Sequence, residues 1–130
     1  MIRRFLHAFP VVLLAAGLLG ALSCATSPPP LSDAGGRPLS ITDYEKLAQK
    51  EYEEGRYENA IVVYQAIIDH YPRNQNALAW AHYEIGYSFY MMEDYDRAER
   101  YFRTVLNRFQ EPAARKLSTQ MLERIREQRN

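Results

Sequence analysis

The sequence repeats itself at a spacing of 38 residues, and this repeat limits the possible folds more than any other feature. Five pairs of core-type side chains share the spacing: Tyr57 and Tyr95, Ala60 and Ala98, Tyr64 and Phe102, Ile67 and Val105, and Tyr71 and Phe109. Five matches at one offset are hard to obtain by chance. A repeat of this length is one structural unit that stacks on its neighbours, and 130 residues have room for only one small domain of such units.

The residues around the matched pairs predict a helix, a tight turn and a second helix in each copy. Thr42 and Glu45 form a capping box that would open the first helix, and Gly55 has the backbone freedom needed to end it. Ala60 and Gly86 are small, because a larger side chain would hold two helices further apart than the roughly 8 to 10 Å of close packing.

This pattern resembles the tetratricopeptide repeat (TPR) family, whose unit is a helix A, a tight turn and a helix B. The resemblance implies an all-α fold, a short α-solenoid with repeat 1 at 41–74, repeat 2 at 75–111 and a C-terminal capping helix at 112–130. The family spacing is 34 residues, so the longer period implies a loop or an extra helical turn around residues 73–77. The positions that the resemblance assigns to helix packing are Leu47, Ala48, Tyr57, Ala60, Tyr64, Gly86, Phe89, Tyr95, Ala98 and Phe102.

The last predicted helix has the pattern of a cap on a repeat stack. Pro112 suits the first helical position, and one face carries four apolar residues among charged ones: Leu117, Met121, Leu122 and Ile125. The chain holds about two and a half repeats, whereas stacked repeats usually need at least three for stability. We therefore expect stabilisation by self-association or by a bound partner.

Residues 1–23 have the features of an export signal. Arg3 and Arg4 precede an uninterrupted apolar or small run at 11–22, which matches the charged start and short apolar core of a signal peptide. Cys24, the only cysteine, follows directly. An uncleaved membrane anchor and a free, unmodified cysteine are the alternatives.

The run that ends at Cys24 resembles the lipobox of bacterial lipoproteins, with Ala21 where that family usually has leucine. The resemblance implies that Cys24 is lipidated and anchors the protein to a membrane. Because residue 25 is not aspartate, it also implies delivery to the outer membrane, facing the periplasm. Residues 24–40 are rich in proline and glycine without apolar periodicity, which predicts a flexible tether.

The helix expected between Leu78 and Met92 is apolar nearly all round, so it must be covered on more than one side. One of its stripes joins the repeat core. We call a second set the aromatic stripe: Trp80, Tyr83, Tyr87, Tyr90 and Met91 of this helix, with Tyr52 at the equivalent position of the first repeat. In TPR proteins these positions line the concave face that holds partner segments, and Tyr and Trp are enriched at binding hot spots. The alternative is that the capping helix and the tether cover the stripe and make it core.

Composition argues against catalysis and nucleic-acid binding. The 16 basic residues are balanced by 16 acidic ones, and three histidines and one cysteine form no catalytic order, phosphate loop or metal-ligand spacing. We therefore predict no enzyme activity, no cofactor and no metal, with His82 at the edge of the core. Charge is segregated, with a net −4 over 42–72 and +5 over 97–130. This could steer a charged partner or favour head-to-tail self-association, or the helices could simply solvate their charges.

These features together predict a membrane-anchored TPR adaptor that binds partner proteins of the bacterial cell envelope. Tyr71 and Pro72 before an alanine-rich, aromatic helix resemble the BamD and CpoB families of envelope TPR proteins, at the level of repeat type. Two alternatives remain: a ligand-handling accessory lipoprotein of a solute transporter, and a purely structural, self-associating module.

Overall fold

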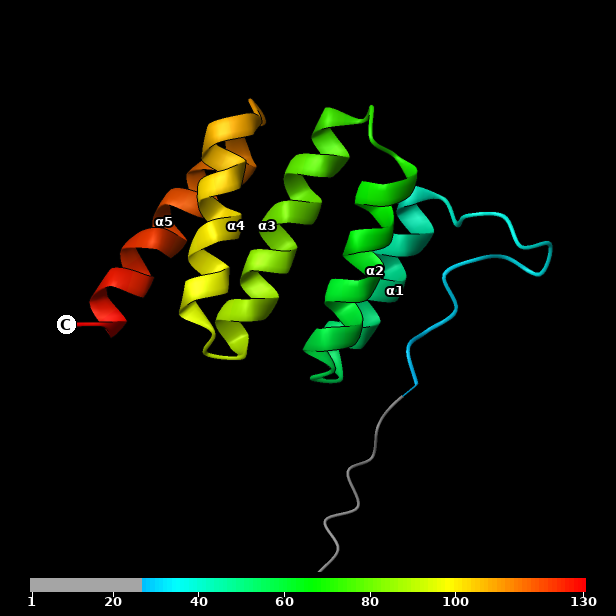
Figure 1. The fold of residues 1–130 in the computed structure, drawn as a ribbon, viewed down its shortest axis with the longest axis horizontal. Coiled ribbons are helices and arrows are strands. Elements are labelled where there is room, and N and C mark those ends of the chain that lie inside the picture. The colour runs from blue at the N-terminus through cyan, green and yellow to red at the C-terminus, as the bar shows by residue number, and fades with distance from the viewer. Residues whose placement is uncertain (1–26) are drawn as a thin grey trace, which may run out of the picture.

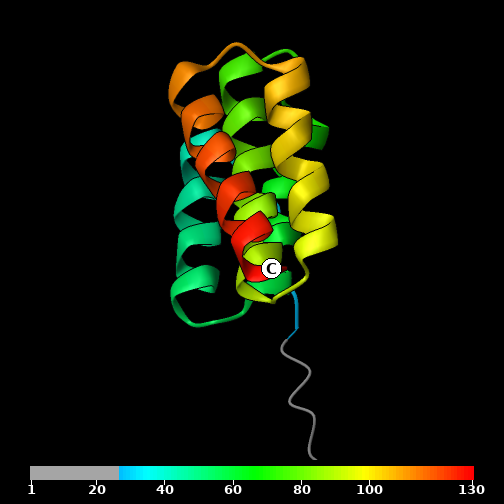
Figure 2. The ribbon, with the colours of Figure 1, turned by 90° about the vertical axis from the view of Figure 1, so that its left-hand side faces the viewer.

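The computed structural model describes residues 27–130, and within this range the chain forms a row of five α-helices without a strand (Figure 1). They are α1 (Ile41–Glu53), α2 (Tyr57–His70), α3 (Gln75–Met91), α4 (Tyr95–Arg108) and α5 (Pro112–Gln128). Each helix packs on the next along the chain, and α5 also contacts α3. Seen along the row from its α5 end, α1 and α5 lie on one side and α4 on the other (Figure 2). The predicted all-α helical repeat is confirmed.

The longer period comes from an extra helical turn in the second repeat. The first helices of the two repeats begin 34 residues apart, at Ile41 and Gln75, but α3 has 17 residues and α1 has 13. At the 38-residue offset Ile41 corresponds to Ala79, so the additional turn is the first turn of α3, residues 75–78. Of the two possibilities predicted around residues 73–77, a loop or an extra helical turn, the structure has the extra turn.

The predicted packing positions form the core. Seven of the ten are buried: Ala48, Ala60, Tyr64, Gly86, Phe89, Ala98 and Phe102. Leu47, Tyr57 and Tyr95 are half-buried at its edge. Gly86 is small for the predicted reason, because a Cβ there would lie 2.9 Å from Cε1 of Phe102 and 3.1 Å from Cβ of Tyr101. The closest approach of α3 and α4 therefore requires glycine at this position.

The two A-to-B turns have the same backbone shape but different residues. Gly55 ends the first turn with φ +73°, and Glu93, its equivalent at the 38-residue offset, has φ +59°. A side chain is strained in this left-handed region, whereas glycine enters it freely.

We expect Glu93→Gly to raise the free energy of unfolding by about 1 kcal/mol, since the relief of backbone strain exceeds the entropy cost of glycine. Chemical denaturation of the two proteins measures the difference. Gly55→Glu is the reciprocal variant, and it should be destabilising by backbone strain alone because a Cβ at Gly55 would meet no atom within 4 Å. A neutral or destabilising Glu93→Gly would contradict the strain argument.

Helix α1 is capped two residues earlier in the chain than predicted. Its N-cap is Ser40, whose Oγ accepts a hydrogen bond from the Asp43 backbone N–H at 3.2 Å and donates one to Asp43 Oδ2 at 2.6 Å. The capping box predicted at Thr42 and Glu45 is wrong, because the Ser-x-x-Asp pair satisfies the free N–H groups earlier in the chain.

The tether predicted for residues 24–40 is shorter than expected. Residues 31–39 form a small loop that folds back onto the helices, with the side chains of Leu31 and Leu39 packed against the core. The Tyr44 hydroxyl donates a hydrogen bond to the Leu31 carbonyl at 2.7 Å, and the Tyr71 hydroxyl donates one to the Leu39 carbonyl at 2.6 Å. Two leucine side chains and two tyrosine hydroxyls therefore hold this proline- and glycine-rich segment on the helices. Among the described residues, 27–30 precede this loop and belong to no helix.

Helix α5 caps the row as predicted, with Pro112 in its first turn. Its buried face is Ala114, Ser118, Met121 and Ile125, while Leu117 and Leu122 are half-buried beside it. The face turned away from the other helices is polar, as a terminal helix requires. In the part of the chain that the structure describes, no helix is long and apolar enough to span a bilayer.

The Ser118 hydroxyl is buried and has no hydrogen-bond partner among the described residues. We expect Ser118→Ala to raise the free energy of unfolding by about 1 kcal/mol, because it removes an unsatisfied polar atom and keeps the shape of the contact. Thermal melting of the two proteins tests this. Ser118→Val serves as the contrast, since its added bulk should be destabilising at a fully buried site.

Candidate partner-binding groove

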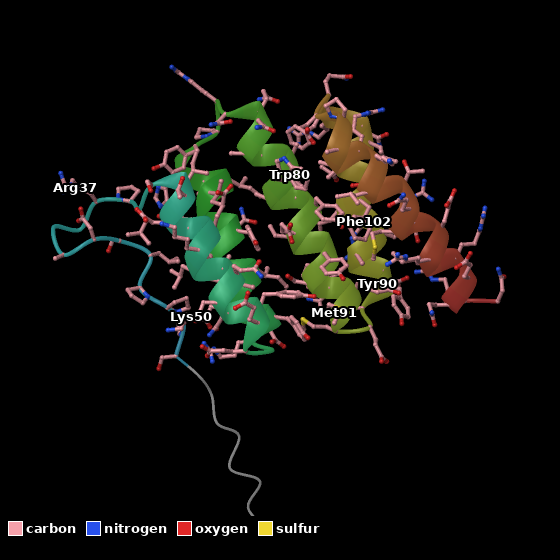
Figure 3. All side chains as sticks on the ribbon, turned by 180° about the vertical axis from the view of Figure 1, so that it is seen from behind. Arg37, Lys50, Trp80, Tyr90, Met91 and Phe102 are labelled. Atoms are coloured by element: carbon pink, nitrogen blue, oxygen red, sulfur yellow. The ribbon has the colours of Figure 1, made fainter. Side chains whose placement is uncertain are left out.

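A groove of about 480 Å³ lies between α1 and α3, with α2 beneath it. Figure 3 shows the face that carries it, with Lys50 on α1 and Trp80 on α3. The α1 wall is entirely polar: Glu45, Lys46, Gln49, Lys50 and Glu53. The opposite wall comes from α3 and is mostly apolar. Helix α1 packs mainly on α2, and α3 packs on α2, α4 and α5. Because α1 and α3 share few contacts with each other, a groove stays open between them.

Helical spacing explains which residues form the α3 wall. On α3, Trp80 and Glu84 are four residues apart and share one face. Ala77 and Ala81 lie on the same wall and leave room beside them. The floor is formed by Tyr64 and Ile67 of α2, which are both buried in the core. The groove thus combines an aromatic side chain and an apolar floor with charges at its rim, which is typical of binding clefts.

Glu84 is the electrostatically unusual group of the groove. Burial raises the pKa of its carboxyl to about 7, and the nearby Glu45 carboxylate adds to the shift. Within residues 27–130 no ion pair or side-chain hydrogen bond compensates for this burial. The same environment raises the pKa of the Tyr64 hydroxyl, mainly through burial. Glu84 therefore titrates near neutral pH.

The aromatic stripe does not form one exposed surface. Of its six residues only Trp80 lines the groove. Tyr83 is 8% exposed, and its ring packs at 5.7 Å from the ring of Phe102. Burial raises the pKa of the Tyr83 hydroxyl to about 12. The placement of Tyr83 on a partner-binding surface is wrong, because α4 packs against this side of α3.

The remaining tyrosines stack mainly on one another. The Tyr87 ring lies 6.1 Å from that of Tyr83 and 6.2 Å from that of Tyr90, with interplanar angles of 14° and 12°. Tyr52 of α1 stacks on Tyr87 at 5.8 Å and thereby links the first repeat to the second. Burial, together with Tyr87, raises the pKa of the Tyr52 hydroxyl. These three tyrosines are half-buried, so much of the stripe connects α1 to α3.

Met91 and Trp80 lie toward opposite ends of α3 (Figure 3). Met91 is 39% exposed and lies in the last turn of the helix, outside the groove. Trp80 is half-buried, and its ring meets that of Tyr83 edge-on at 5.8 Å. Trp80 is thus the stripe residue best placed to contact a segment bound between α1 and α3.

Sequence reasoning missed Glu84 as a site residue. The signal was present, since Glu84 is the only acidic residue in the 17 residues of α3 and follows Trp80 by one helical turn. A lone carboxylate in a mostly apolar helix is a candidate site residue when it has no partner.

The remaining candidate residues are His82, possible metal ligands and Cys24. His82 is half-buried, with Nδ1 2.8 Å from the Leu78 carbonyl oxygen, and burial lowers its pKa. Its ring packs at 5.1 Å from that of Phe109, so the prediction of a core-edge histidine is confirmed. No cluster of His, Cys, Asp and Glu suited to a metal ion occurs among residues 27–130. Cys24 and the signal sequence lie outside the described residues.

The fold and the groove define a helical-repeat protein of the kind that binds other proteins. A family model described as tetratricopeptide repeat matches residues 51–121. The chain therefore belongs to the tetratricopeptide repeat family, whose members generally mediate protein–protein interactions and are typically not enzymes. No curated protein and no solved structure matches the chain. The likeness to the BamD and CpoB families stays a prediction.

Proposed function

We propose that this TPR protein is a membrane-anchored adaptor of the bacterial cell envelope that binds a segment of a partner protein between α1 and α3. The open groove with Trp80 on its wall is the observation that carries the proposal. Tryptophan contributes a large, stiff contact area, and the charged α1 wall can orient a bound chain. The family's general role in protein binding supports the same conclusion.

Photo-crosslinking from the groove tests this function. A photoreactive amino acid at Gln49, on the α1 wall, is introduced into the full-length protein in its native envelope. The matched control carries the same group at Val62, which is 40% exposed on α2 and does not line the groove. We expect an adduct with a second protein from position 49 that is absent from position 62 and is lost in Trp80→Ala.

The alternatives give different outcomes. An adduct between two copies of the chain would support the self-associating module. No protein adduct, together with stoichiometric retention of a small molecule by the purified protein, would support the solute-transporter accessory. Identical adducts from positions 49 and 62 would contradict the groove. The melting curve of Trp80→Ala is recorded in parallel, to show that any loss of crosslinking occurs in a folded protein.

The membrane anchor is tested separately at Cys24. We infer that this residue is lipidated, because an unpaired cysteine directly follows the apolar run of the signal. The six residues between Cys24 and the docked loop at Leu31 could span at most about 20 Å, so a lipid at Cys24 would hold the repeat domain close to the membrane. We expect the wild type to incorporate labelled fatty acid and to fractionate with membranes, and Cys24→Ser to do neither. An unlabelled wild type would contradict the anchor and leave the groove proposal unaffected.

A further inference from the structure

Glu84 differs from every other carboxylate that is buried or half-buried in residues 27–130. Each of the others has a side-chain or capping partner. Glu51, for example, accepts hydrogen bonds from Arg56 Nε at 2.6 Å and from Asn59 Nδ2 at 2.8 Å. The rest are Asp33, Asp94, Glu99 and Glu111, which are bonded to arginine side chains or to a helix N-terminus. Among the described carboxylates, only Glu84 is half-buried without such a partner, and it lines the groove.

The charges around Glu84 favour a positively charged ligand. The groove holds three carboxylates, of Glu45, Glu53 and Glu84, against the two ammonium groups of Lys46 and Lys50. Neither lysine forms an ion pair with Glu84 in the described structure. A cation placed beside Glu84 would neutralise a carboxylate that burial has deprived of water, and it would also screen Glu84 from Glu45. A partner carboxylate at the same point would be repelled.

We propose that Glu84 receives a lysine or arginine side chain of the partner segment, with the aliphatic part of that side chain packed along Trp80. The proposal rests on the proposed function, because it names the chemistry of the partner that occupies the same groove. Trp80 and Glu84, one turn apart on α3, fit the two parts of such a side chain: an apolar stem and a charged end. The partner is thus a protein segment with an exposed basic residue.

This pairing makes binding dependent on pH. Glu84 must be ionised to hold the cation, so affinity should fall as the pH is lowered from 8 to 6. The titratable and charged groups that face Glu84 are Glu45, Lys46, Lys50, Tyr52 and Glu53 of α1, Tyr64 of α2 and Tyr83 of α3. The variant Glu84→Gln leaves all of these in place, so any pH dependence that it removes belongs to Glu84.

Immobilised peptide pools test the proposal with the full-length protein. Each pool contains nine-residue peptides with random flanks and a fixed central residue, which is arginine, lysine, glutamate or citrulline. Citrulline has nearly the shape of arginine without its charge. We expect the arginine and lysine pools to bind roughly 10- to 100-fold more tightly than the citrulline and glutamate pools at pH 8. This preference should shrink at pH 6 and disappear in Glu84→Gln.

Two controls separate the possible outcomes. Glu58→Gln, an exposed carboxylate of α2 outside the groove, should keep the wild-type preference, and melting curves show that both variants are folded. If all pools bind equally and Trp80→Ala abolishes this binding, the role of Glu84 is overturned and the groove function stands. A basic preference that survives in Glu84→Gln would also overturn it. No binding to any pool at either pH would count against both the groove and Glu84.

Discussion

Replacing Phe102 with alanine is expected to lower the free energy of unfolding by about 3 to 5 kcal/mol. Phe102 is fully buried, and its ring packs on Tyr83 and against the backbone of α3 at Gly86. Truncation would leave a cavity between α3 and α4, lined by side chains that are themselves held in the core. Folded domains of ordinary size are stable by only about 5 to 15 kcal/mol, so the loss would be a large part of the total. Urea denaturation measures it.

A double-mutant cycle with Gly86 tests the reason for this loss. Gly86→Ala alone should be destabilising, because its Cβ would press on the Phe102 ring, although alanine is favoured over glycine in a helix by about 1 kcal/mol. In the Phe102→Ala background the ring contact is gone and the 3.1 Å approach to Cβ of Tyr101 remains, so the same change should be clearly less destabilising. We expect an interaction free energy of at least about 1 kcal/mol between the two sites. Additive effects would show that the ring does not explain the glycine.

Glu84 should make the protein less stable at pH 8 than at pH 5. Its pKa is raised to about 7 in the folded state, so the folded chain holds a proton there that the unfolded chain has already lost. Stability from this group is therefore greatest below the unfolded-state pKa of 4.5 and declines as the pH rises toward 7. A shift of this size corresponds to roughly 2 to 4 kcal/mol.

We therefore expect Glu84→Gln to be more stable than the wild type by roughly 2 to 4 kcal/mol at pH 8 and by about 1 kcal/mol or less at pH 5. Urea denaturation at the two pH values measures both differences, and Glu58→Gln should follow the wild-type profile.

The pKa shift of Glu51 has the opposite sign from that of Glu84. Its pKa is lowered to about 2, mainly by the hydrogen bond from Arg56, so its contribution is lost only as the pH falls from 4.5 toward 2. If the stability of Glu84→Gln varied with pH as that of the wild type does, the Glu84 carboxyl would be solvated in the folded protein.

The candidate site shows where sequence reasoning stops. Trp80 was predicted as a partner-binding residue and does line the groove, whereas Tyr83, three residues later on the same predicted stripe, is buried against Phe102. The pattern of one helix shows which side chains share a face, but it does not show which face a neighbouring helix covers. The position of Glu84 as the only acidic residue of α3 was visible in the sequence, but the groove that it faces is formed with α1 and α2 and was not.

The sequence by itself determined the repeat type, the turn at Gly55, the need for glycine at position 86 and the start of the last helix at Pro112. These features depend on backbone conformation and on the 38-residue period, both of which one chain records locally. Only the tertiary structure decided that the loop around Leu31 and Leu39 docks on the helices, that Tyr83 is core, and that a groove lined by Glu84 stays open between α1 and α3. Burial is a property of the neighbours of a residue, and those neighbours are chosen when the helices pack.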